Sequence, residues 1–318
     1  MAKKQLAAKP GTQKGIIKPD NIVKFEVPEV QDASQSEEPQ ELKLMDFLQS
    51  AMPDRKRTTI KDFLKYRQVM VNGNVTTRFD LELHPGDDVR VNTTREFQTF
   101  YHPRMRLVYE DDDIIVVEKG YGLLSMGTDK VKEGTAYSIL RDYLKRKDPR
   151  NKIFIVHRLD RDTSGLMMFA KNIRAKEAMQ HNWNNMVLER KYLAVVEGTI
   201  EPESGEIRSY LAENTAHQVY STPDPKQGQL AVTYYKTLRK KGAYSLVELS
   251  LATGRKNQIR VHMKDTGHPI AGDHRYGAKT SPAHRLCLHA ATLRFVHPVT
   301  RKDMNFNCNM PAAFSKLV

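Results

Sequence analysis

One polar loop contains residues whose types and order could perform chemistry at an electrophilic carbon. It reads His157-Arg158-Leu159-Asp160-Arg161-Asp162-Thr163-Ser164-Gly165 and lies between two short apolar runs. Loops held by rigid strands are common positions for catalytic groups. Asp160 is flanked by Arg158 and Arg161, which would hold its carboxylate ionised. An ionised carboxylate in such a loop can act as a nucleophile or as a general base.

Two other interpretations of this loop follow from the same residues. Asp162, Thr163 and Ser164 are typical of a surface turn whose side chains bond to the local backbone. The pair Asp160 and Asp162 is also compatible with a glycoside hydrolase, which usually employs two carboxylates. Alternate residues of an extended segment point to opposite faces, however, and the neighbouring arginines suit a phosphodiester better than a neutral sugar.

The elements around the loop predict an α+β domain built on a mixed or antiparallel sheet. Helical spacing of apolar residues is clearest at 135–147 and again at 173–183. Short strands are predicted at Leu107–Tyr109, Ile114–Val117, Ile153–Val156, Leu166–Ala170, Tyr192–Val196, Val232–Thr237, Ser245–Leu251 and Leu293–Val296. The loop with Asp160 thus connects two of these strands.

The N-terminal third predicts a flexible tail and a small separate domain. Residues 1–41 lack sustained periodicity, so we expect a tail there. Residues 42–92 predict two helices and a hairpin with the turn signal Asn72-Gly73. Residues 93–105 are then a linker, and 106–318 form the large domain. Three cations recur at four-residue spacing on the polar side of the second helix and are candidate RNA contacts: Arg57, Lys61 and Lys65.

Composition limits the functional classes. The chain has 318 residues, enough for two domains, and a net charge of +13, which favours a polyanionic partner such as RNA. No run is long enough to span a bilayer and no secretory signal is evident, so we expect a cytoplasmic protein. The two cysteines, Cys287 and Cys308, are too few for a disulfide framework or a zinc site. We therefore expect no metal and no cofactor.

The nine residues of the polar loop resemble the signature of the RluA-type pseudouridine synthases. Further segments extend this resemblance over residues 106–318. They are Arg190-Lys191-Tyr192, Thr253-Gly254-Arg255-Lys256-Asn257-Gln258-Ile259-Arg260-Val261-His262, Gly267-His268-Pro269-Ile270, Gly272-Asp273, Tyr276-Gly277 and Arg285-Leu286-Cys287-Leu288-His289-Ala290. Residues 42–92 resemble the small S-four-type RNA-binding domain, with Val71-Asn72-Gly73 and Pro85-Gly86-Asp87 as markers.

The resemblance implies an enzyme that isomerises chosen uridines of RNA to pseudouridine without a cofactor. Asp160 would attack C1′ of the ribose, stabilise a cationic sugar, or remove the C2′ proton in a glycal route; the sequence leaves these routes open. Arg260 would pair with Asp160 and keep it anionic. Tyr192 would pack against the flipped base and take the C5 proton, with an ordinary strand aromatic as the alternative.

The resemblance also implies residues that contact RNA. Arg158 would fill the place of the extruded uridine, and an ion pair with Asp162 is the alternative. His157 and Arg161 are further candidate contacts, although a histidine beside a strand also serves as a structural hydrogen-bonding group. The base pocket would be walled by two apolar residues that are otherwise core: Ile259 and Leu286.

The substrate is less constrained than the reaction. S-four-type domains commonly accompany synthases of large-subunit ribosomal RNA, so we expect that RNA, with transfer RNA as an alternative. A ribosome-assembly protein that binds RNA without catalysis is the second functional class, and DNA is the least expected partner. We expect a monomer. Gly120 replaces a proline common in the family, and Lys256-Asn257 replaces its usual Thr-His, so substrate choice is open at both places.

Overall fold

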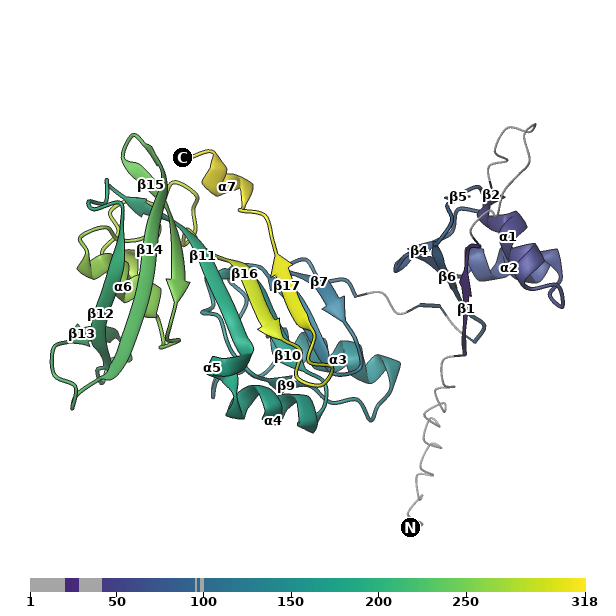
Figure 1. Ribbon diagram of the computed structural model, residues 1–318, viewed down its shortest axis with the longest axis horizontal. Coiled ribbons are helices and arrows are strands. Elements are labelled where there is room, and N and C mark those ends of the chain that lie inside the picture. Colours follow the sequence, from purple (N-terminus) through teal and green to yellow (C-terminus); the bar gives the residue numbers. More distant parts are fainter. Residues whose placement is uncertain (1–20, 29–41, 95, 98–99) are drawn as a thin grey trace, which may run out of the picture. The chain divides into compact units, whose positions relative to one another are not determined.

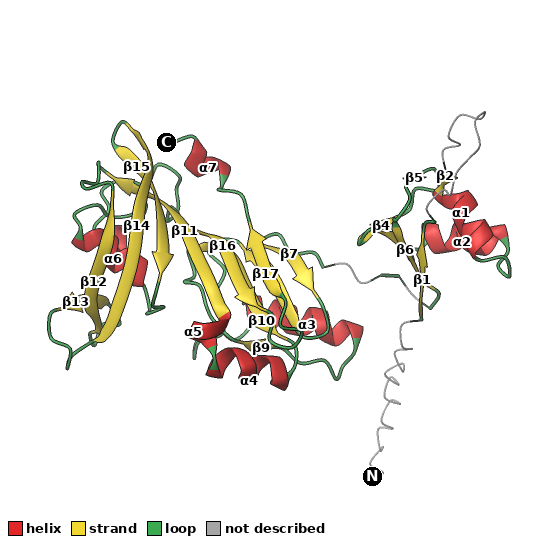
Figure 2. Cartoon of the chain, in the orientation of Figure 1, coloured by secondary structure: helices red, strands yellow, loops and turns green. Residues whose placement is uncertain are grey.

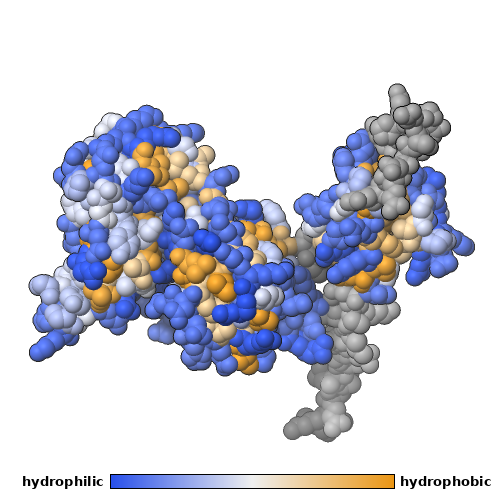
Figure 3. All heavy atoms as spheres, viewed as in Figure 1, coloured by the Kyte–Doolittle hydropathy of each residue, from blue (hydrophilic) through white to orange (hydrophobic). Residues whose placement is uncertain are grey.

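The computed structural model describes residues 21–28, 42–94, 96–97 and 100–318. The chain divides into two compact units, one formed mainly by residues up to 99 and the other by residues from 100 onward (Figure 1). No helix in the described part is long and apolar enough to cross a membrane. On the face drawn in Figure 3, hydrophilic side chains cover most of each unit, as expected when apolar side chains are collected in a core.

The first unit combines two helices with a four-stranded antiparallel sheet. The helices are α1 (Leu44–Ala51) and α2 (Arg57–Lys65). The sheet has the order β1-β6-β3-β4, from β1 (Ile22–Glu26), β3 (Val69–Val71), β4 (Asn74–Thr76) and β6 (Asp88–Asn92). A separate short pair joins β2 (Leu42–Lys43) to β5 (Glu82–Leu83). Leu48 and Ile60 of the helices are fully buried with Val89 of the sheet, so the two layers share one core.

The prediction of a tail over residues 1–41 is wrong at Ile22–Glu26. This segment forms β1 and pairs antiparallel with β6. Phe25 makes an edge-to-face contact with Phe47 of α1, and Val27, directly after the strand, is buried. The five residues alternate between exposed and half-buried, and the half-buried Phe25 packs against the core, although the composition of the whole segment argued against order. Residues 1–20 and 29–41 of the predicted tail lie outside the described residues.

The predicted linker over residues 93–105 is longer than the connection between the two units. On its N-terminal side, Phe97 is buried and its backbone N–H donates to Arg67 O at 3.0 Å. On its C-terminal side, the Phe100 ring contacts the Tyr143 ring, and Met105 already belongs to a strand. Residues 95, 98 and 99 lie outside the described residues. Both ends of the predicted linker thus take part in the packing of their own unit.

The second unit is built on one large mixed sheet. Its path is β13-β12-β14-β15-β11-β16-β10-β8-β7, with β17 added to β16 and β9 added to β10 (Figure 2). The strands are β7 (Met105–Glu110), β8 (Ile114–Lys119), β9 (Phe154–Ile155), β10 (Ser164–Ala170), β11 (Val187–Glu197), β12 (Ser204–Glu213), β13 (Val219–Thr222), β14 (Gln229–Lys241), β15 (Tyr244–Leu251), β16 (Leu288–Val296) and β17 (Asp303–Asn307). Only the short pairing of β10 with β16 is parallel among the described strands, so the predicted α+β class with a mixed sheet is confirmed.

Helices cover both faces of the sheet around its central strands. They are α3 (Ala136–Lys147), α4 (Ile173–His181), α5 (Trp183–Met186), α6 (Gln258–Asp265), the 3-10 turn η1 (His274–Tyr276) and α7 (Ala312–Ser315). In β10, Met167 and Phe169 pack in the core that contains α3, whereas Leu166 and Met168 pack in the core that contains α4. Alternate residues of a strand point to opposite faces, so a strand covered on both sides must be apolar throughout.

Candidate active site

The loop between β9 and β10 is held in place by buried hydrogen bonds. The Ser125 hydroxyl donates to Leu159 O at 2.6 Å and accepts from Leu159 N at 3.1 Å. Lys119, which is fully buried, donates to Arg161 O at 3.0 Å and also to the carbonyls of Gly120 and Leu123. Bonds of this kind fix the backbone on both sides of Asp160. The loop is therefore a rigid support for its side chains, not a free surface turn.

Gly165 closes the loop because only glycine fits there. Its φ is +116°, and a Cβ would lie 2.2 Å from Ala290 O on β16. Ser164, just before it, accepts a hydrogen bond from Arg285 Nη2 at 2.6 Å and lies 2.8 Å from His289 Nδ1. The close approach of β10 and β16 thus explains the final glycine of the nine-residue motif.

Asp160 and Arg260 meet at the site, as the family resemblance implies. Arg260 Nη1 lies 3.6 Å from Asp160 Oδ2. The guanidinium is oriented by Asp273, which accepts from Arg260 Nε at 2.7 Å and from Nη2 at 2.8 Å. Asp273 has only 1% of its side-chain surface exposed, whereas Asp160 has 23%. A bidentate pair has one preferred geometry, so Asp273 directs the third nitrogen of Arg260 toward Asp160.

Helix α6 positions Arg260 through its N-terminal residues. Asn257 precedes the helix with a φ of 54°, a left-handed conformation that asparagine tolerates better than most residues. Its amide donates to the Tyr276 hydroxyl at 3.0 Å and accepts from Arg260 Nη1 at 3.3 Å. Gln258 is buried and bonds through both ends of its amide, to Thr253 among others. The unusual Lys256-Asn257 pair is thus compatible with a correctly oriented Arg260.

Burial and nearby cations act in opposite directions on Asp160. Burial raises the pKa of its carboxyl above the usual range, while Arg260 and then Arg158 lower it. The prediction that Arg158 and Arg161 hold this carboxylate ionised is wrong in one respect, because Arg161 pairs with Asp162 at 3.2 Å instead. Arg260 contributes the larger opposing effect. The carboxylate is thus poorly hydrated, which favours reaction with an electron-poor carbon.

Tyr192 comes from β11 and is buried beside the same carboxylate. Burial raises the pKa of its phenol, and the charge of Asp160 adds to this effect, although Arg190 opposes it. The phenol is therefore protonated at neutral pH in the free protein. Its ring forms part of the apolar core of this unit, together with Ile259 and Leu286. The arrangement favours a packing role for the Tyr192 ring over a role as a resting base.

Two cavities meet at Asp160. The smaller, of about 400 Å³, is lined by Tyr192, Ile259 and Leu288 together with polar groups, and its size is at the lower end of ligand pockets, about 300–1,000 Å³. The larger, of about 1,180 Å³, is lined mostly by polar and basic groups and includes Leu286. Asp160, Arg158, Asn257 and Arg260 line both. The two predicted pocket walls, Ile259 and Leu286, thus face different cavities.

The predicted RNA contacts of the loop differ in their exposure to solvent and in the partners they already have. Arg158 is exposed, and its Nη1 lies 3.9 Å from Met126 Sδ, so the alternative of an ion pair with Asp162 is not seen. Arg161 is exposed but engaged with Asp162. His157 accepts from Met168 N at 2.9 Å through Nε2, and burial lowers its pKa to about 3. A neutral, backbone-bonded ring fits the structural alternative for His157 better than a phosphate contact.

The three predicted contacts on α2 belong to the first unit. Arg57, Lys61 and Lys65 are exposed, whereas Ile60 and Leu64 of the same helix are buried. The basic face is thus presented to solvent. The helix begins at Arg57, and Lys56 precedes it without a side-chain cap.

Gly120 has a structural explanation of its own. Its backbone N–H, which a proline would lack, donates to Arg104 O at 2.7 Å, and a Cβ would lie 2.9 Å from that oxygen. The adjacent Tyr121 ring lies under the Arg285 guanidinium at 4.4 Å. A backbone hydrogen bond therefore fixes the loop at Gly120, where a proline would fix the φ angle instead.

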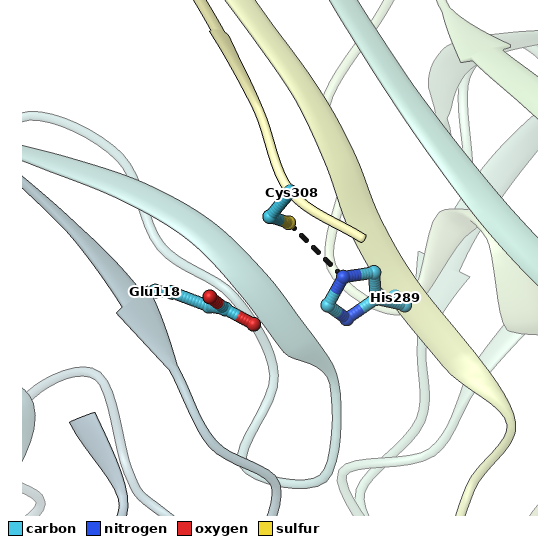
Figure 4. A group of neighbouring side chains, drawn as sticks. All are labelled: Glu118, His289 and Cys308. Carbon is cyan, nitrogen blue, oxygen red and sulfur yellow. Dashed lines mark hydrogen bonds between the residues drawn. The ribbon is translucent and has the colours of Figure 1, made fainter. Parts of the chain in front are cut away.

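Among the described residues, two groups have donor atoms close enough to hold a metal ion. One is Glu118, His289 and Cys308, whose side chains converge in Figure 4. His289 Nε2 lies 3.0 Å from Cys308 Sγ, and Glu118 accepts from Arg106 at 2.6 Å. The second group is Asp111, Asp113 and His297, with His297 Nε2 bonded to Asp111. In each group the histidine is bonded to one other member, and the third side chain has a partner outside the group: Arg106 for Glu118 and Asn172 for Asp113.

Sequence reasoning missed two residues that orient the site. Asp273 was visible only as part of the matching pair Gly272-Asp273, and nothing local indicated its contact with Arg260. Lys119 directly precedes Gly120; two of its three carbonyl partners, Gly120 and Leu123, are close in the chain, and the third, Arg161, comes from a distant segment. Burial lowers the pKa of Lys119 to about 7, although Asp162 and Asp160 raise it. Asp273 acts on the site by orienting the side chain of Arg260, and Lys119 acts by holding the backbone next to Asp160.

Comparison with known proteins gives consistent matches. The model of the RNA pseudouridylate synthase family matches residues 113–265. RNA pseudouridine synthase YlyB of Bacillus subtilis (strain 168) is 34% identical over 294 residues, which cover 90% of this chain and 96% of that protein. Ribosomal large subunit pseudouridine synthase D of Pasteurella multocida is 30% identical over 85% of this chain and 88% of its own. The solved structure of human RNA pseudouridylate synthase domain containing 4 covers 66% of this chain and 90% of its own at 24% identity, with a TM-score of 0.54, and shows the same fold.

Proposed function

The chain belongs to the RNA pseudouridine synthase family, and from this premise we propose that it converts specific uridines of large-subunit ribosomal RNA to pseudouridine with Asp160 as the catalytic carboxylate. The reaction breaks the bond between uracil N1 and ribose C1′ and joins C5 to C1′. The C5 proton is lost and N1 regains one, so no oxidant or cofactor is consumed. The ribosomal substrate rests on relatives such as the synthase D proteins, whose names specify the large ribosomal subunit.

The observation that carries the catalytic assignment is the position of the Asp160 carboxylate. It lies where two cavities meet, and the nearby Arg260 is already fixed by Asp273. A carboxylate with little hydration and one oriented cation suits attack at C1′, stabilisation of a positively charged sugar or removal of the C2′ proton. Asp162 does not form a second catalytic carboxylate with it, since Asp162 pairs with Arg161. This arrangement argues against the glycosidase interpretation.

The two cavities suggest how RNA enters. The target uridine must leave its stack, which costs a few kcal/mol and less in loops. The smaller cavity, with Tyr192 and Ile259 in its walls, would accept the flipped base. The larger cavity carries Arg104, Arg275 and Arg285 in its lining and would follow the phosphate backbone. Arg158, which lines both, is placed to fill the space that the base vacates.

One experiment distinguishes the proposed function from its two alternatives, a transfer RNA substrate and RNA binding without catalysis. Pseudouridines would be mapped by carbodiimide labelling in total RNA from cells that lack this protein, complemented with wild type or with Asp160→Ala. We expect sites in large-subunit ribosomal RNA to vanish and to return only with wild type. Sites that vanish from transfer RNA instead would redirect the substrate. Unchanged maps in all strains would remove the catalytic proposal and favour a binding protein of ribosome assembly.

We also propose that residues 42–92, with β1, act as the S-four-type RNA-binding domain. Replacement of Arg57, Lys61 and Lys65 together by Ala should weaken RNA binding about tenfold at 0.1 M salt. The dependence of the binding constant on salt concentration should also become less steep, because binding releases about one counterion fewer for each phosphate contact that is lost. Filter binding across a salt series measures both. A matched variant at the hairpin end, Arg239, Lys240 and Lys241 to Ala, should change neither beyond about twofold. Equal affinity for the α2 variant and wild type would contradict the role of this face.

The remaining parts of the proposal concern assembly and location. Asp160, Tyr192 and Arg260 are all supplied by one chain, which supports a monomer as the active form. RNA is proposed as the nucleic acid, in preference to DNA, because the matching relatives are named for RNA. We place the protein in the cytoplasm, where ribosomal RNA of bacterial relatives is made and modified.

A further inference from the structure

We propose that Trp183 is a stacking platform for an RNA base that flanks the target uridine. The inference rests on the proposed function and deepens it, because it adds a residue that contacts substrate outside the catalytic group. Trp183 is the only tryptophan of the chain. It begins α5, the short helix that leads directly into β11, the strand of Tyr192 (Figure 2). Its indole lines the smaller cavity together with Asp160.

The position of the indole is fixed by two neighbours of different kinds. The His157 ring lies 5.2 Å from it, centroid to centroid, with an interplanar angle of 42°. Because burial lowers the pKa of His157 to about 3, this partner is an uncharged ring at neutral pH. The Arg190 guanidinium lies 5.7 Å from the indole centroid. An aromatic ring held by a second ring and a cation keeps one orientation, which reduces the entropy lost when a base stacks on it.

Arg190 itself lacks a carboxylate partner within the described part of the chain. Its Nη2 donates to Leu251 O at 3.3 Å, and burial lowers its pKa. The backbone makes room for it at Gly254, where a Cβ would lie 2.7 Å from Arg190 Nη1. A guanidinium kept in a cavity without an anion is unfavourable unless a ligand supplies the charge. A phosphate of the bound strand, next to the base on Trp183, would supply it.

The apolar packing of Trp183 does not by itself account for these features. One side of the residue contacts the core that contains Met186 and Phe295. The residue is nevertheless only half-buried and lines the cavity that holds the catalytic group. Unstacked bases of RNA are commonly recognised on aromatic rings and arginine planes. The geometry therefore points to a nucleotide beside the flipped uridine as the occupant.

The first test uses Trp183 as its own reporter. Wild-type protein is titrated with an RNA hairpin that has a uridine-rich loop, and with the same hairpin carrying abasic loop positions. Binding is followed by anisotropy of an end label, and indole emission is corrected with free N-acetyltryptophanamide. We expect the uridine loop to quench the indole with the same midpoint as the anisotropy, and the abasic loop to quench it little. Saturated anisotropy with unchanged indole emission by the uridine loop would overturn the inference.

The second test separates stacking from folding. Trp183→Leu keeps apolar volume against the core, and Trp183→Phe keeps an aromatic face. With the RNA that mapping identifies as substrate, Trp183→Leu should raise KM about tenfold, the effect of one lost base stack, with kcat changed less than about twofold. Trp183→Phe should recover most of this loss. Tyr234→Leu, an exposed aromatic on β14, is the matched control and should leave KM unchanged.

The outcomes distinguish the inference from the proposed function. If wild type forms pseudouridine and Trp183→Leu does so with an unchanged KM, the platform is wrong and the function stands. If wild type neither binds nor modifies RNA, both are wrong. A higher KM for Trp183→Leu that Trp183→Phe restores supports the platform.

Discussion

Replacement of Asp160 by Asn is expected to lower the rate of pseudouridine formation by at least about 10⁴-fold, a loss typical of removing a reacting group. The amide has nearly the same shape, so the loop and its anchors should keep their structure. It cannot serve as the nucleophile or base, and it does not stabilise a cationic sugar as an anion does. Single-turnover assays with excess enzyme measure this rate without interference from product release.

RNA binding by Asp160→Asn should not fall together with the rate. The amide introduced by Asp160→Asn carries no negative charge toward the phosphates, so affinity should stay within about threefold of wild type or improve. Asp162→Asn is the matched control: it removes a carboxylate from the same loop, but one that is half exposed and paired with Arg161. This control should retain activity within about fivefold. If Asp160→Asn keeps most of the activity while Asp162→Asn loses it, the assignment of the catalytic carboxylate is wrong.

Local patterns predicted the elements that are regular along the chain. The apolar run at β10 and the helical spacing of α3 are visible because both faces of the strand and one face of the helix are buried. β12 and β17 were missed because their residues are mostly polar and exposed, and their pairing with β14 and β16 supplies what the sequence does not show. β1 was missed because three of its five residues are exposed and its partner β6 lies far along the chain.

The site shows the same division between local and distant information. Asp160 was found because its loop carries a long matching motif, and Arg260 because its segment carries another. Asp273 could not be found from spacing, since its role depends on a bidentate contact with a helix thirteen residues away in the chain. The sequence offered an ion pair of Asp162 with Arg158 only as an alternative, and the structure pairs Asp162 with Arg161. The choice between Arg158 and Arg161 depends on side-chain directions in a loop, which no periodicity encodes.

Loss of Arg260 should reduce activity and also shift its pH dependence. Arg260→Gln is expected to lower kcat/KM by about 10²–10³-fold, the usual effect of removing one oriented stabilising group. The reaction needs ionised Asp160, and Arg260 lowers the pKa of that carboxyl. Without the cation the pKa rises further, so the acidic limb of the kcat/KM profile should move to higher pH. Part of the lost activity should therefore return as the pH is raised.

The buried Asp273 requires a second variant, because breaking a buried pair on one side costs roughly 3–5 kcal/mol of stability. Arg260→Gln with Asp273→Asn removes both charges and should fold better than Arg260→Gln alone, as thermal unfolding would show. Asp273→Asn alone keeps the Arg260 charge but loses its orientation, so it should lower kcat/KM. The charge of Asp273 raises the pKa of Asp160, so its removal should not move the acidic limb to higher pH. The same acidic limb in wild type and in the folded double variant would mean that Arg260 orients substrate and does not tune Asp160. A shift to higher pH in the double variant, with no such shift in Asp273→Asn, would show that the charge of Arg260 promotes the ionisation of Asp160.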